Sequence, residues 1–163
     1  MLRKLLLVSF LILGINLSAF ESLIQSSNND ENFKIEMLRL VNQIRSEGCQ
    51  CGRRHMPPAP PLEWNNKLTK AARLHAKDMN TEKFIGHRGS NGSKISERIA
   101  ATEYKWKAVG ENVSWGPRTV EGAVLGWKDS PNHCLTLMST SYKEMGAASD
   151  GKFWVQNFGQ EMK

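Results

Sequence analysis

Two histidines and one glutamate in this sequence are placed where a side chain can project into a cleft. His87 follows Gly86 in a turn-rich loop, His133 comes just after a Ser-Pro turn signal, and Glu111 opens a strand-like run after Gly110. Two imidazoles and one carboxylate can hold a zinc ion that keeps an open coordination position. The same three groups can act as a general acid and base. Because they lie far apart in sequence, only the fold can bring them together.

The spacing alone leaves two interpretations of these residues open. There is no compact zinc motif such as H-E-x-x-H. A covered carboxylate such as Glu111 needs partners or loses its charge, and histidines are suitable partners, so a purely structural cluster is the alternative. Of the other histidines, His55 lies in a proline-rich loop and is expected to be exposed. His75 lies on the apolar face of a helix, where a structural role is expected.

The stretch "SPNHC" places His133 directly before Cys134. It could be a metal corner, a Cys-His nucleophile pair or a disulfide anchor beside a polar site. Neighbouring residues on a helix diverge by about 100°, which disfavours the nucleophile pair. The other cysteines are Cys49 and Cys51. Export favours disulfides over a structural zinc, and the odd count leaves at least one cysteine free or paired outside the chain.

The first residues have the composition of a secretory signal. Arg3 and Lys4 precede an apolar run from Leu5 to Leu13, and small residues follow. We predict a signal peptide over residues 1–19, cleaved after Ala19. The nine-residue run is too short to span a bilayer, so we expect no transmembrane segment in the mature chain. The product should be secreted, either extracellular or periplasmic.

Composition bounds what the mature chain can do. Residues 20–32 are polar and rich in Ser and Asn, which predicts a leader, and residues 33–160 are long enough for one domain with a real core. The formal charge of +6 falls to +4 when the two basic residues leave with the signal. Such a mild and scattered excess does not predict nucleic-acid binding.

Helical periodicity recurs along the chain and is interrupted by loops. The first helix is expected from Phe33 to the residues before Gly48, and the prolines of residues 49–61 predict a loop without regular structure. Asn65 is a good N-cap for the second helix, and Thr119 for another. The other expected segments are a turn-rich loop at 86–93, a short helix at 93–100, a helix at 119–130 and a short helix or turn at 131–138.

Three segments have strand character. Residues 108–116 read as one strand, and the runs 144–149 and 152–159 are joined through Asp150-Gly151, a strong hairpin signal. Helices therefore come first, then a strand, a helix and a closing hairpin. This order predicts an α+β fold in which helices cover an antiparallel sheet.

Several motifs occur in the order of a known family. They include "GHRGSNGSKISERI", "VGENVSWG", "VEGAVLGWKDSPNHCLTLM" and "FWVQNFG". Over about residues 33–159 the chain resembles a domain of the CAP superfamily, named for cysteine-rich secretory proteins, antigen 5 and pathogenesis-related proteins, in its bacterial-type branch. The resemblance implies an α-β-α sandwich with a central antiparallel sheet between helices.

The resemblance also implies a cleft. Its two histidines fall on His87 and His133, and the glutamate of "GEN" falls on Glu111. Where animal and plant members have a second glutamate, this chain has Ser130, and the neighbouring Asp129 is offset by about 100° on a helix. The loss of one anionic ligand weakens the case for a divalent metal such as zinc, which His87, Glu111 and His133 would still hold.

Bacterial-type members often pair a cysteine after the first helix with one beside the second histidine. Carried over to this chain, that pairing is Cys51 with Cys134, which leaves Cys49 free or intermolecular. His133 would then be the site residue and Cys134 a disulfide anchor.

The resemblance implies a fold more firmly than an activity. We expect a secreted ligand-binding or interaction module that uses the cleft, with a cell-envelope component, a lipid or a host protein as partner. One alternative is a metal-assisted or acid/base hydrolase using His87, Glu111 and His133, although no serine or cysteine nucleophile motif is present. Another alternative is a structural or stress-related surface protein.

Overall fold

The computed structural model describes residues 17–162. They form two compact units, divided between Glu31 and Asn32, which are described separately. Most of the expected signal peptide lies outside the described residues. Within the described range, none of the helices combines the length and the apolar character that a membrane crossing requires.

Helix α1 (Leu17–Glu47) begins well before Phe33, where the first helix was expected. Residues 20–32, predicted as a polar leader before the first helix, lie within α1, so the expected start of that helix is wrong. These residues are exposed. Local bonds support the helix here, such as that from Gln25 to Asn29, whereas apolar periodicity detects only residues that pack. Packing begins after Asn32, where Met37 and Val41 are fully buried.

A four-stranded sheet forms the centre of the second unit. Its strand order is β3-β5-β6-β4. Strand β4 (Trp106–Trp115) pairs antiparallel with β6 (Phe153–Glu161), which pairs antiparallel with β5 (Glu144–Asp150). Asp150 pairs with Phe153, so the predicted hairpin is confirmed, and its turn residues are Gly151 and Lys152.

One edge of the sheet departs from the expected antiparallel arrangement. Strand β3 (Glu63–Trp64) runs parallel to β5, with Trp64 opposite Met145. A strand of two residues is too short to show periodicity. The long connection from β3 to β5 passes through several other elements, which a parallel pair requires.

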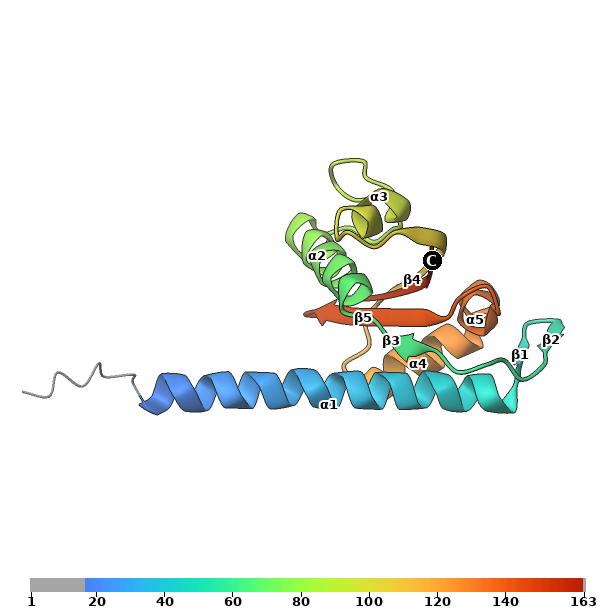
Figure 1. Ribbon diagram of the computed structural model, residues 1–163, viewed down its shortest axis with the longest axis horizontal. Helices are drawn as coiled ribbons and strands as arrows, with labels where there is room; N and C mark the ends of the chain where they lie inside the picture. Colours follow the sequence, from blue (N-terminus) through green and yellow to red (C-terminus); the bar gives the residue numbers. More distant parts are fainter. Residues whose placement is uncertain (1–16, 163) are drawn as a thin grey trace, which may run out of the picture. The chain divides into compact units, whose positions relative to one another are not determined.

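Helices cover both faces of this sheet, so the predicted α-β-α sandwich is confirmed (Figure 1). One face packs against α2 (Asn66–Glu82) and α3 (Ile95–Ala100). The other packs against α4 (Val120–Asp129), α5 (Pro131–Met138) and the part of α1 that follows Asn32. The largest core cluster lies on this second face and includes Met37, Trp127, Leu137, Trp154 and Phe158.

Two helices begin at the residues that the sequence predicted. The Asn65 side chain accepts hydrogen bonds from the backbone N–H groups of Lys67 and Leu68, at 2.9 and 3.3 Å. The Thr119 hydroxyl accepts one from Gly122 at 3.1 Å. These caps satisfy donors that the first helical turn leaves unpaired.

The segment 49–61 was expected to lack regular structure, and this is wrong for its first half. Strands β1 (Cys49–Cys51) and β2 (Arg54–Met56) form an antiparallel hairpin. Its prolines begin only at Pro57, so nothing in the first half prevents pairing. Gly52, with φ of 61°, supplies the left-handed residue of the turn.

Candidate functional site

Glu111 lies at the centre of the candidate site and is held between a histidine and an arginine. It sits in β4 opposite Asn157 of β6, with a side chain only 2% exposed. One carboxylate oxygen accepts a hydrogen bond from His87 Nδ1 at 2.9 Å. The other accepts one from Arg98 Nη2 at 2.7 Å. Both oxygens are therefore occupied, and the buried charge has the partners it needs.

The loop between α2 and α3 presents His87 and is fixed at several points. Arg98 Nη1 donates to the backbone carbonyls of His87 and Ser93, at 3.0 and 2.9 Å. Asp78 of α2 accepts hydrogen bonds from the backbone and the hydroxyl of Ser90. The loop therefore holds its histidine in place although the side chain of His87 is 57% exposed.

Sequence reasoning missed Arg98. It lies on α3, immediately before the fully buried Ile99, and its side chain is 11% exposed. The covered carboxylate of Glu111 was expected to need a partner, but only the histidines were considered for that role. The arginine supplies a permanent positive charge, which a histidine does not.

His75 holds the backbone beside His87 in place. It is buried on α2, as the apolar face predicted, and its Nε2 lies 2.8 Å from the carbonyl oxygen of Gly86. A carbonyl only accepts, so Nε2 carries the proton, and the contact anchors the residue next to His87. Burial lowers the pKa of His75. His55 is exposed in β2, as expected.

His133 lies on α5, which packs on the other face of the sheet. It is half-buried in the first turn of α5, and its backbone carbonyl accepts a hydrogen bond from Asn112 Nδ2 at 3.2 Å. Because Asn112 follows Glu111 in β4, this bond ties α5 to the strand beside the carboxylate. Ser130, which links α4 to α5, is also half-buried, and its side chain does not cap the helix.

The pKa values of the two histidines shift in opposite directions. The hydrogen bond to Glu111 raises the pKa of His87, although partial burial opposes it. Burial lowers the pKa of His133, and repulsion from His87 lowers it further. As the pH falls, His87 therefore takes up a proton before His133 does. Two titratable groups with opposite pKa shifts can form an acid and base pair.

The donor set fits a zinc ion only in part. Because Glu111 binds His87 Nδ1 and Arg98, the free ligand atom of His87 is Nε2. A carboxylate that orients a ligating histidine in this way is common around zinc. Within residues 17–162, however, the only three metal-ligating side chains whose ligand atoms lie within 4.8 Å of one another are Cys49, Cys51 and Cys134. Glu111 therefore lies behind His87, at its Nδ1, and His133 is the other imidazole that the sequence predicted for the site.

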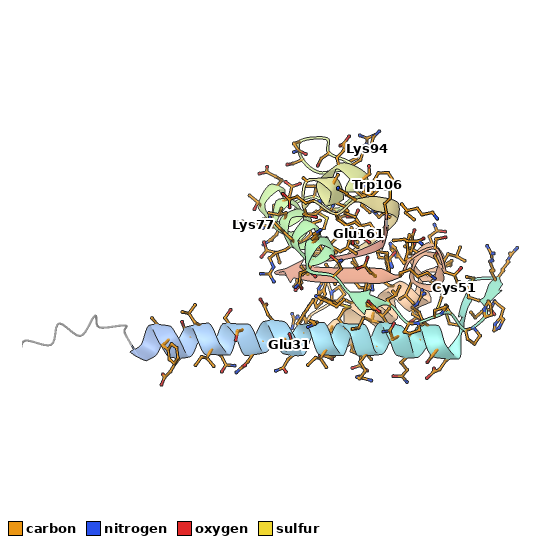
Figure 2. The ribbon with its side chains drawn as sticks, in the orientation of Figure 1. Glu31, Cys51, Lys77, Lys94, Trp106 and Glu161 are labelled. Atoms are coloured by element: carbon orange, nitrogen blue, oxygen red, sulfur yellow. A yellow bond between two sulfur atoms is a disulfide. The ribbon has the colours of Figure 1, made fainter. Side chains whose placement is uncertain are left out.

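A disulfide joins Cys51 to Cys134, the pairing that the resemblance implied, with a Cα–Cα distance of 5.4 Å. The bridge connects the β1–β2 hairpin to α5 at the residue that follows His133. Figure 2 labels Cys51. Cys49 is a free thiol and is buried.

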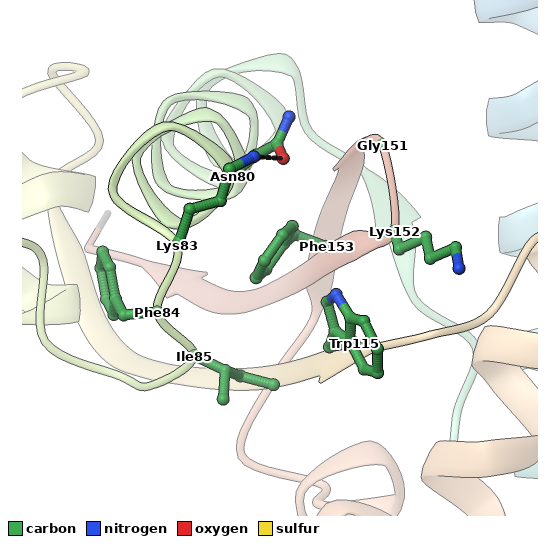
Figure 3. Close-up of a pocket in the computed structure, with 8 residues that line it drawn as sticks. All are labelled: Asn80, Lys83, Phe84, Ile85, Trp115, Gly151, Lys152 and Phe153. Carbon is green, nitrogen blue, oxygen red and sulfur yellow. Dashed lines mark hydrogen bonds between the residues drawn. The ribbon is translucent and has the colours of Figure 1, made fainter.

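A separate groove of about 760 Å³ lies where the turns at one end of the sheet meet the end of α2 (Figure 3). Its apolar wall includes Phe84, Phe153 and the exposed Ile85 and Trp115. Lys152 contributes a cation, with Nζ 5.6 Å from the centre of the Trp115 ring. The groove also contains Asn80, Lys83 and Gly151.

Solved structures share this fold. An extracellular protein containing an SCP domain from Bacillus anthracis is 24% identical with a TM-score of 0.69, covering 77% of this chain and 39% of that one. An outer surface protein from Borrelia burgdorferi is 18% identical with a TM-score of 0.63, covering 83% of this chain and 94% of that one.

An uncharacterized membrane protein of Bacillus subtilis, YlbC, is 27% identical over 97 residues. The match covers 60% of this chain but only 28% of that relative. Residues 38–158 match the cysteine-rich secretory protein family. The chain therefore belongs to this family, the CAP family.

Proposed function

We propose that this CAP domain is a ligand-binding module of the extracellular or cell-envelope space, and that its binding site is the cleft of His87, Glu111 and His133. One observation carries the proposal. The buried carboxylate of Glu111 orients His87 through Nδ1, yet most of the imidazole remains exposed to a ligand. A purely structural histidine would gain more from burial of its ring.

The cleft chemistry suits a weakly bound divalent cation. Nε2 of His87 and the ring of His133 would hold the ion, while Glu111 fixes the tautomer of His87. Zinc bound there would polarise a ligand oxygen as a Lewis acid. Arg98 already neutralises Glu111, so this carboxylate acts on the orientation of His87 rather than as a direct ligand.

A zinc titration by calorimetry tests the proposal. We expect weak binding at about pH 7.5 that falls strongly by about pH 5.5, because zinc needs neutral imidazoles. Since the pKa of His87 is raised, proton competition begins above the ordinary histidine range. His87→Ala and His133→Ala should each weaken zinc binding at least about tenfold. His55→Ala is the matched control, because His55 is an exposed histidine outside the cleft.

Equal zinc binding by His87→Ala and the unmodified chain would contradict the cleft assignment. Absence of binding at both pH values would remove the metal role and leave an acid and base pair. The opposite pKa shifts of His87 and His133 favour that hydrolase alternative.

The groove supports a second ligand class, an amphiphile with an anionic head group. Trp115 and Ile85 are 58% and 55% exposed, which offers apolar contact, and Lys83 and Lys152 offer positive charge. A lipid among the expected partners would match this combination. The proposal includes that the protein is secreted and that a cell-envelope component or a host protein is its partner.

Decanoate, a soluble single-chain carboxylate, is a suitable probe for the groove. We expect it to change tryptophan fluorescence saturably, and we expect Trp115→Ala to weaken its binding at least about fivefold. Leu125→Ala is the control, because Leu125 is 42% exposed on α4, outside the groove. Equal loss of binding in both variants would mean that decanoate binds apolar surface without regard to the groove.

A further inference from the structure

Three cysteine sulfurs converge in the core beneath the β1–β2 hairpin. Alternate residues of a strand share a face, so Cys49 and Cys51 of β1 both point to Cys134 on α5. Cys49 Sγ lies 3.2 Å from Cys134 Sγ and 3.8 Å from Cys51 Sγ. Cys51 and Cys134 are almost fully buried, and Cys49 is 9% exposed. One of the three thiols is free while the other two form the disulfide.

We propose that the reduced form of this chain binds one soft metal ion through Cys49, Cys51 and Cys134. An external dithiol would supply two electrons and two protons to open the disulfide, becoming a disulfide itself. Zinc–sulfur bonds of about 2.3 Å place tetrahedral ligands about 3.8 Å apart. Cys49 and Cys51 already have this separation, and the freed Cys134 sulfur must move away from Cys51 toward the same spacing.

The site has an entry path. Cys49 lines a cavity of about 590 Å³ between α1 and α4. Carboxylates also line this cavity, on Glu47, Glu121 and Asp129, and they outnumber the ammonium of Lys128. This balance of charge attracts cations to the opening.

The surroundings of Cys49 and Cys134 act in opposite directions on the ionisation of their thiols. Burial raises the pKa of Cys49, but the nearby Lys128 opposes this rise. Cys134 lies in the first turn of α5, where the helix dipole stabilises a negative sulfur. On binding, each thiol releases its proton to solvent, and three thiolates select thiophilic ions such as Cu⁺, Cd²⁺ or Zn²⁺ over Mg²⁺ or Ca²⁺. Disulfide formation and metal binding exclude each other because they use the same sulfurs.

Cd²⁺ alone is a direct probe of the proposal. The full chain is reduced with a phosphine, freed of it without oxygen, and titrated with Cd²⁺. We expect a thiolate-to-cadmium ultraviolet band that saturates at one ion per chain, with a melting temperature that rises with Cd²⁺ concentration. The oxidised chain should not show the thiolate-to-cadmium band, and its melting temperature should rise much less at the same Cd²⁺ concentration.

Cys49→Ser is the informative variant, because it removes one ligand and leaves the disulfide pair in place. When oxidised it should melt like the unmodified chain, which shows that it folds. When reduced it should bind Cd²⁺ at least about tenfold more weakly than the reduced unmodified chain. Equal affinity of the two reduced chains would overturn the proposal. If reduction alone unfolds the chain, Cd²⁺ must restore its near-ultraviolet circular dichroism, and failure to do so would also overturn it.

Discussion

Glu111→Ala is expected to lower the free energy of unfolding by about 3–5 kcal/mol. The substitution leaves the guanidinium of Arg98, which is only 11% exposed, without its anionic partner. It also releases His87 Nδ1 and opens space beside β4. Urea denaturation followed by circular dichroism measures the change. Glu82→Ala, which removes an exposed carboxylate of α2, is the control and should change stability by less than about 0.5 kcal/mol.

A second substitution separates the ion pair from the cavity. Arg98→Met in the Glu111→Ala background removes the unpaired charge, so it should recover part of the lost stability. A loss below about 1 kcal/mol in Glu111→Ala would contradict a buried pair. His87→Ala should cost far less, because its side chain is 57% exposed. That contrast distinguishes a structural carboxylate from a histidine available to ligands.

The histidine contact also has a defined pH dependence. The pKa of His87 is raised in the folded state by its hydrogen bond to Glu111. The stabilising contribution of this bond is therefore fully present below the unfolded pKa of about 6.5. The contribution disappears as the pH rises through the folded pKa. His133 behaves in the opposite way, because its pKa is lowered and its neutral form stabilises the fold above about pH 6.5. Lowering the pH therefore strengthens the stabilising contact of His87 with Glu111 and removes the stabilisation that neutral His133 provides.

Local sequence signals predicted the elements whose cause is itself local. The side chain of Asn65 caps α2, and Asp150-Gly151 joins β5 to β6, because these effects depend on residues next to one another. The apolar faces of α2 and α4 were predictable for the same reason. Local patterns did not reveal β3, which exists only because β5 is available to pair with it.

The residues that sequence reasoning missed depend on distant partners. Arg45 is fully buried near the end of α1, where a surface arginine would be the default expectation. Its side chain donates to the carbonyls of Pro60, Leu137 and Ser139 at 2.8, 2.6 and 3.0 Å. No pattern near Arg45 shows that these carbonyls converge on it. Arg98 was missed for the same reason, since Glu111 reaches it through the tertiary fold.

The disulfide accounts for the second large expected effect. Replacing Cys51 and Cys134 together by serine should lower the free energy of unfolding by about 4.5 kcal/mol, because the bridge closes a loop with a sequence separation of 83. Cys49→Ser is the matched control and should cost much less, since it leaves the bridge intact. Urea denaturation of the oxidised proteins measures both changes.

Loss of the disulfide and loss of Glu111 should also destabilise different parts of the fold. Without the bridge, the short β1–β2 hairpin keeps its own pairing and its packing on α4 and α5, so hydrogen exchange should accelerate there first. His133 is the residue before Cys134, and a loosened α5 should therefore weaken zinc binding in the cleft as well. A double variant that unfolds within about 1 kcal/mol of the unmodified chain would show that packing alone holds the hairpin and α5 together.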